Sequence, residues 1–166
     1  MMRYMLGRFS LRIPSFFPFL ALTLVSVGSS TAQQVATQQP SPRERTLLAE
    51  SYINERLAVW QQRLNLKDWN ITVAMARTNE LKPKTLGNIH WDLPKKTALI
   101  HVLDPSDYHL PYREMLQDME FTVVHELIHL ELAPILSDLQ RSDANRREEE
   151  HSVNHMADAL LKLDRK

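Results

Sequence analysis

The 166 residues of this chain contain no cysteine. A disulfide framework and a metal site with thiolate ligands are therefore both excluded. An excess of positive charge is missing as well, since 20 lysines and arginines face 20 aspartates and glutamates. Three of those arginines and no acid fall in residues 1–32, so the remainder carries 17 basic against 20 acidic residues, a net charge of −3. A nucleic-acid-binding domain usually presents a basic face, and this composition predicts no nucleic-acid partner.

A long apolar run is also absent. The apolar stretch at residues 16–27 is shorter than the ~20 residues that a membrane-spanning helix needs. It follows the three arginines and precedes small residues, the pattern of an export signal. We therefore expect a signal peptide over residues 1–32, cleaved near Ala32, and an exported protein, periplasmic or extracellular, with no stable membrane association. An uncleaved anchor is the alternative.

Residues 33–40 are rich in glutamine and threonine and are expected to form a flexible spacer. Residues 41–166 are enough for one domain. Ser41, Pro42 and Glu44 form a capping box with proline at the first helical position, which predicts a helix to about residue 64. Further segments follow the periodicity of strands or helices: strands at 71–75, 86–91 and 97–103, with a possible bulge at Gly87, and helices from about 113 to 132, ended by Pro134, and from about 147 onward.

These elements predict an α+β domain with an N-terminal helix, a small three- to four-stranded sheet, and two C-terminal helices. The short turn between the last two strands indicates a meander. Nothing in the sequence indicates an oligomeric state.

The pattern most specific for a chemistry is His125-Glu126-x-x-His129. Residues four apart on a helix lie on one face, so both histidines can direct a ring nitrogen at one zinc ion. Glu126 stands beside the first histidine, where its carboxylate can accept a proton from a water at the ion. The neighbouring residues are apolar, which is typical of a buried helix whose polar groups are functional. An ordinary pair of histidines on an amphipathic helix is the competing interpretation.

A catalytic zinc site needs three protein ligands, so a third must come from elsewhere. The longer motif His-Glu-x-x-His-x-x-Gly-x-x-His is absent. Leu132 occupies the position of its glycine, and Ile135 occupies the position of its third histidine. On the last helix, Glu149 and Glu150 lie about 40° and 60° from Val153 on the inward face, while His151 and His155 point outward. The periodicity does not choose between the two glutamates, and an aspartate from the preceding connection is a further alternative.

The motif with a glutamate from a following helix resembles the thermolysin-type gluzincins. The segment Glu150-His-Ser-Val-Asn154-His-Met-Ala157 is similar to the Glu-x-x-Ala-Asn-x-Phe-Ala helix of the small ImmA/IrrE-type metallopeptidases, and the order of elements looks like a minigluzincin. The resemblance implies that Glu150 is the third zinc ligand and that Asn154 supports a zinc-bound histidine. Glu149 is the alternative ligand. The chain departs from the pattern at Glu131, where a hydrophobic residue is usual.

The resemblance further implies an exported zinc-dependent metallopeptidase, with Zn²⁺ as cofactor and a peptide or protein as substrate. Glu126 would be the general base, and the substrate would pair with an edge strand, expected at residues 98–103. The alternatives are a non-catalytic zinc-stabilised binding module and a regulatory protease of the ImmA/IrrE type. No residue matches a motif for the group that stabilises the oxyanion, and four candidates come from nearness in sequence alone: His101, Tyr108, His109 and Tyr112.

Overall fold

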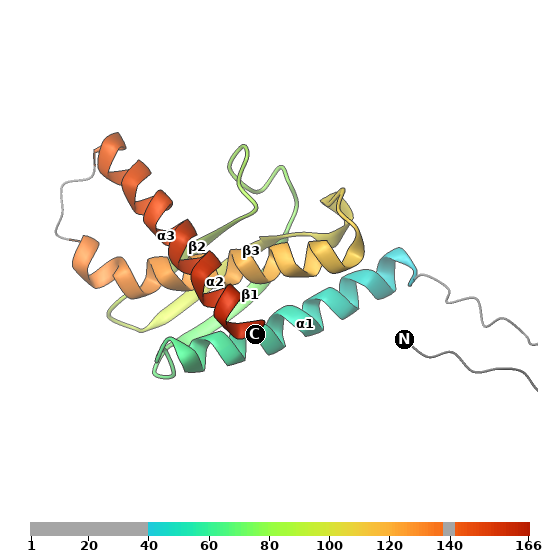
Figure 1. Cartoon of the computed structure of the whole chain (residues 1–166), viewed down its shortest axis with the longest axis horizontal. Helices are drawn as coiled ribbons and strands as arrows, with labels where there is room; N and C mark the ends of the chain where they lie inside the picture. The colour runs from blue at the N-terminus through green and yellow to red at the C-terminus, as the bar shows by residue number, and fades with distance from the viewer. Residues whose placement is uncertain (1–39, 138–141) are drawn as a thin grey trace, which may run out of the picture. The chain divides into compact units, whose positions relative to one another are not determined.

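Three helices and a three-stranded mixed sheet make up the part of the chain described by the computed structural model, residues 40–137 and 142–166. The α+β class is confirmed. The expected signal peptide and the spacer up to residue 39 lie outside the described residues. The elements follow in the order α1 (Pro42–Arg63), β1 (Asn70–Ala76), β2 (Gly87–Asp92), β3 (Thr97–Leu103), η1 (Pro105–Asp107), α2 (Tyr112–Leu136) and α3 (Asp143–Asp164) (Figure 1).

Helix α1 begins at the capping box expected from the sequence. The Ser41 hydroxyl accepts a hydrogen bond from the Glu44 N–H at 3.3 Å, and the Glu44 carboxylate accepts one from the Ser41 N–H at 2.8 Å. Two backbone donors that have no partner within the helix are thereby satisfied. The helix buries one stripe of side chains, Ala49, Ile53, Leu57 and Trp60.

The strand order is β1-β3-β2, with β2 antiparallel and β1 parallel to β3. The expected meander is therefore wrong, because β1 pairs with the far side of β3. The expectation that residues 98–103 form an edge was also wrong. That strand is central, and its burial suits the position: Ala98, Ile100 and Val102 are all within the core. Gly87 pairs in register with Val102 and forms no bulge.

Helix α2 lies between the sheet and α3 and also packs along α1 (Figure 1). It continues one turn further than expected, to Leu136, with Pro134 inside it. Proline there removes the one N–H that would bond to the Leu130 carbonyl. The next turn still closes, since the Ser137 N–H donates to the Ala133 carbonyl at 2.9 Å.

Helix α3 begins one turn earlier than the expected start near residue 147. Ser142 caps it by accepting a hydrogen bond from the Asn145 N–H at 3.1 Å, the type of serine cap that favours a helix start. A narrow apolar stripe faces α2, and its fully buried members are Val153, Ala157 and Leu161.

A buried polar cluster ties the three helices together around Glu120, whose side chain is 4% exposed. Its carboxylate accepts hydrogen bonds from the Tyr52 hydroxyl at 2.8 Å, Arg56 Nε at 2.6 Å and the Trp60 indole at 2.8 Å. Arg56 also reaches Asp164 at the end of α3. Because each partner is satisfied, the buried charge is compatible with a stable core.

Replacing Glu120 by glutamine is expected to destabilise the fold by about 1.5–3 kcal/mol, the usual contribution of a charge-assisted hydrogen bond. The amide cannot accept all three hydrogen bonds with the strength of a carboxylate. Denaturant unfolding followed by circular dichroism measures the change, with Glu131→Gln, an exposed position on the same helix, as control. Equal stability of the two variants would contradict a structural role for the cluster.

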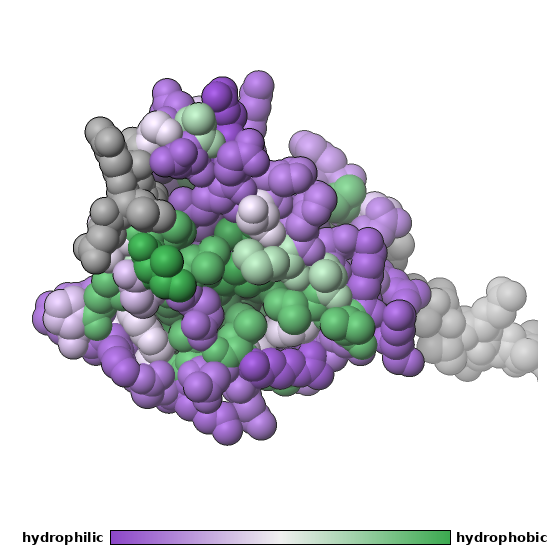
Figure 2. Space-filling view, turned by 60° about the vertical axis from the view of Figure 1, so that its left-hand side comes forward, coloured by the Kyte–Doolittle hydropathy of each residue, from purple (hydrophilic) through white to green (hydrophobic). Residues whose placement is uncertain are grey.

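Among the described residues, no helix has the length and apolar character required to cross a membrane. Some large apolar side chains are nevertheless exposed, including Leu47 and Leu48 on α1 and Ile135 on α2. Figure 2 shows apolar surface gathered across one face inside a polar border. Exposed apolar residues that stand singly are normal on folded domains and need no functional explanation.

Candidate metal centre

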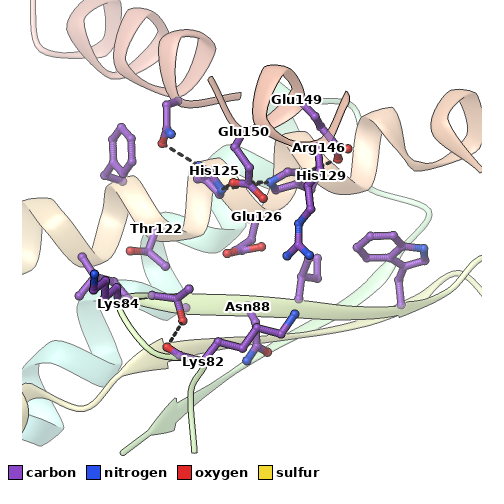
Figure 3. A pocket seen from close by; sticks show the side chains of 17 residues that line it. Lys82, Lys84, Asn88, Thr122, His125, Glu126, His129, Arg146, Glu149 and Glu150 are labelled. Atoms are coloured by element: carbon purple, nitrogen blue, oxygen red, sulfur yellow. Dashed lines mark hydrogen bonds and ion pairs between the residues drawn. The ribbon is translucent and has the colours of Figure 1, made fainter. Parts of the chain in front are cut away.

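The middle of α2 presents His125, Glu126 and His129 on the side of the helix that faces a pocket. The intervening apolar residues are buried and hold this turn against the sheet and the other helices. The two histidine side chains are 14% and 11% exposed, and their Nε2 atoms are 3.0 Å apart. The one-turn spacing of the motif thus brings two nitrogen ligands to one point (Figure 3).

Glu150 from α3 brings a third ligand atom to the same point. Its Oε2 lies 3.4 Å from His125 Nε2 and 3.6 Å from His129 Nε2. Zinc holds nitrogen and oxygen ligands at about 2.0–2.2 Å in a tetrahedron, which separates neighbouring ligand atoms by roughly 3.3–3.6 Å. The two separations that involve Glu150, 3.4 Å and 3.6 Å, match this range, and the 3.0 Å between the two nitrogens is slightly shorter. The donor set and its spacing are therefore close to those of a zinc site with one position open.

The other nitrogen of each histidine has an acceptor on α3. His125 Nδ1 lies 3.1 Å from Asn154 Oδ1, and His129 Nδ1 lies 3.0 Å from Glu149 Oε1. If each Nδ1 carries the proton and donates it, each Nε2 is left with a lone pair aimed at the shared point. Both rings are therefore oriented as metal ligands require.

The two adjacent glutamates that the periodicity left unresolved have different positions. Glu150 faces the Nε2 atoms, whereas Glu149 contacts Nδ1 of His129 on its outer side. Both are only partly exposed, as expected for the inward face of α3. His151 and His155 are exposed on the outer face, with their ring centroids 4.2 Å apart.

Glu126 is 7% exposed and lies below the two histidines in Figure 3. No group in the described ranges 40–137 and 142–166 donates a hydrogen bond to its carboxylate. Burial, together with the nearby charge of Glu150, raises the pKa of Glu126 to about 8. A cation at the three ligand atoms would lower the pKa of Glu126, because positive charge favours the ionised carboxylate.

The His125 ring responds to the same surroundings. Burial, reinforced by the neighbouring His129 ring, lowers the pKa of His125. A lowered pKa favours the neutral imidazole, which is the form that binds a metal. Burial therefore favours the form of His125 that binds a metal.

The pocket that contains these groups has a volume of about 370 Å³. Its walls come from α2, the first half of α3, strand β2 and the loop before β2. The Leu103 N–H donates to the Leu86 carbonyl at 2.8 Å. Hydrogen bonding alternates along an antiparallel pair, so the N–H and C=O groups of Gly87, Ile89 and Trp91 point to the open edge of β2. An extended backbone could pair there.

Several pocket residues were not identified from the sequence, among them Lys82, Lys84, Trp91 and Arg146. They lie in loops, on a strand or at a helix start, where periodicity carries no signal for function. Conversely, none of the four candidates for stabilising an oxyanion lines the pocket. His101 bonds to Asn88 through its ring, and Tyr108 donates to Asp118, so those two have structural partners.

Gly87 is the point where β2 passes closest to α2. A Cβ atom there would lie 2.4 Å from Thr122 Cγ2 and 2.6 Å from the His101 carbonyl oxygen. Gly87→Ala is therefore expected to push β2 away from α2 and to cost about 1–3 kcal/mol of stability. Chemical unfolding tests this, with His90→Ala on the exposed side of the same strand as control.

The loss of stability could come from the contact with the Thr122 methyl group or from the contact with the His101 carbonyl oxygen, and a double variant separates the two. Thr122→Ser removes the methyl group that the new Cβ would meet, but the backbone oxygen of His101 remains. The double variant should therefore recover stability only in part. Full recovery would contradict the role of the backbone contact.

Comparison with protein-family models, with curated proteins and with solved structures finds no match for this chain.

Proposed function

We propose that this chain is an exported zinc-dependent metallopeptidase of gluzincin type. The observation that carries the proposal is the convergence of His125 Nε2, His129 Nε2 and Glu150 Oε2 within 3.0–3.6 Å of one another. Beside them lies a buried glutamate, Glu126, that has no described hydrogen-bond partner. A purely structural zinc site needs ligands but no such free carboxylate, which favours catalysis over the zinc-stabilised binding module.

Each residue has a distinct role in the proposed reaction. Zinc, when bound, supplies a Lewis acid that acidifies water and polarises the scissile carbonyl. Glu126 accepts the proton of the attacking water and delivers it to the leaving amine as general acid. Asn154 and Glu149 keep the two imidazole rings in the orientation and tautomer that leave Nε2 free.

The substrate is proposed to bind as an extended strand along the open edge of β2. The backbone groups of Gly87, Ile89 and Trp91 supply hydrogen bonds, and all three residues line the pocket. This replaces the central strand β3 as the docking edge. Main-chain pairing of this kind recognises a peptide of many sequences, so further selectivity has to come from side chains of the pocket.

The proposal is tested with the purified, processed protein. We expect about one equivalent of zinc by elemental mass spectrometry, and hydrolysis of a broad peptide library that stops on chelation and returns with added zinc. Tight zinc binding without hydrolysis of any peptide would favour the binding module. Hydrolysis that persists after complete metal removal would refute the metal mechanism.

A further inference from the structure

Three positively charged residues, Lys82, Lys84 and Arg146, line the pocket. Within residues 40–137 and 142–166, no carboxylate forms an ion pair with any of them. Some other cations of the described residues are paired, as Arg56 is with Glu120 and Arg77 with Asp107. Three carboxylates, of Glu126, Glu149 and Glu150, line the same pocket. The three cations therefore stand beside the proposed metal ligands without forming an ion pair.

The loop that carries Lys82 is held in place. Leu81 is buried in a small cluster with Ala76 and Leu103. The carboxylate of Asp107 binds the Arg77 guanidinium at 2.6 Å and 3.0 Å and the Thr78 N–H at 2.9 Å. These contacts anchor the start of the loop to the end of the sheet, so the lysine is presented from a supported backbone.

The turn after Lys82 adds to this support. Pro83 and Lys84 occupy its two central positions, and Lys84 has φ 65°, as the third residue of a type II turn requires. The Thr85 N–H and hydroxyl both donate to the Lys82 carbonyl, at 3.1 Å and 2.8 Å. The backbone of Lys82 is thereby fixed at the rim of the pocket.

Arg146 reaches the same pocket from the opposite wall, the first turn of α3. In Figure 3 the charged ends of Lys82 and Arg146 extend toward one another, while Lys84 lies apart from them. Two like charges that approach each other repel unless an anion lies between them. Lys82 and Arg146 thus offer two cationic groups to one anion next to the metal residues.

We propose that Lys82 and Arg146 bind a carboxylate of the peptide substrate, an inference that rests on the proposed peptidase function. The planar guanidinium can hold both oxygens of a carboxylate, and the ammonium group adds a mobile point charge. A peptide offers this chemistry in two places, an acidic side chain and its free C-terminus. The first would make the protein selective for acidic residues near the cleaved bond, and the second would make it cleave close to the C-terminus.

The test measures binding separately from catalysis. The probes are fluorescent alanine hexapeptides with glutamate or glutamine at each position in turn, each with a free or amidated C-terminus. Fluorescence anisotropy gives their affinity for the metal-free protein, and hydrolysis is followed separately with the zinc-loaded protein. Lys82→Met and Arg146→Met are compared with Arg147→Gln, an exposed neighbour that does not line the pocket.

We expect the unaltered protein to bind the carboxylate member of one pair about tenfold more tightly, as a charge-assisted contact predicts. Each methionine variant should abolish this preference, Arg147→Gln should keep it, and added salt should weaken it. The pair that shows the preference identifies the source: glutamate over glutamine for a side chain, free over amidated for a C-terminus. No preference in any pair, or a preference that survives either methionine variant, overturns the proposal.

The two proposals fail in different ways. Carboxylate-dependent binding without any hydrolysis would refute the peptidase and keep the carboxylate site. Hydrolysis with no carboxylate preference in binding would refute the carboxylate site and keep the peptidase.

Discussion

Glu126→Gln is expected to lower the rate of peptide hydrolysis by ~10²–10⁴-fold, the usual contribution of a general acid–base, while zinc content stays the same. The substitution keeps the shape of the side chain but removes its ability to accept and return a proton. The three converging ligand atoms belong to His125, His129 and Glu150, so none is altered. Initial rates on one cleavable peptide, and metal content of the same sample, provide the measurement.

The fold should tolerate this change, because the Glu126 carboxylate accepts no hydrogen bond from the described residues. Glu131→Gln is the matched control, since it removes the same charge from an exposed position on the same helix. Hydrolysis at the original rate in the Glu126 variant would remove this residue from the mechanism. Loss of zinc together with activity would show that its role is to hold the metal.

Glu150→Ala and Glu149→Ala are expected to differ in their effect on zinc affinity. The first deletes a ligand atom, so affinity should fall by more than the ~10–100-fold that loss of an outer partner costs. The second leaves all three ligand atoms but removes the acceptor at His129 Nδ1, so the decrease should stay within that range. Competition with a chromophoric chelator of known affinity measures both.

The two variants control for each other, because the residues are adjacent on α3 and both are partly exposed. A larger loss of zinc affinity for Glu149→Ala than for Glu150→Ala would make Glu149 the metal ligand and Glu150 the outer partner. Unchanged affinity in both variants would refute a centre built from α2 and α3.

Local patterns predicted much of this molecule. The capping box at Ser41 and Glu44 set the start of α1 through contacts three residues apart, and the His-Glu-x-x-His spacing placed two ring nitrogens on one helical face. Strand order escaped prediction because it depends on pairing between distant segments: β1 and β2 are neighbours in sequence but lie on opposite sides of β3.

Helical periodicity could not choose between Glu149 and Glu150, for a different reason. Both positions lie near the inward face of α3, and only the angle at which α3 crosses α2 decides which carboxylate meets the Nε2 atoms. The family resemblance favoured Glu150, which is the residue that lies there. Lys82 and Arg146 could not be found at all, since a loop and a first helical turn bring them together without any periodic signal.

Helix α3 is attached near both ends by polar contacts. Close to its start, Glu149, Glu150 and Asn154 meet the histidines of α2, and at its end Asp164 pairs with Arg56 and Arg63. Its fully buried stripe between them is short. An ion that binds ligands from both helices would therefore hold α3 against α2. By mass action, its binding free energy would add to the free energy of folding. Zinc supply would then govern the lifetime of the folded protein as well as the proposed hydrolysis.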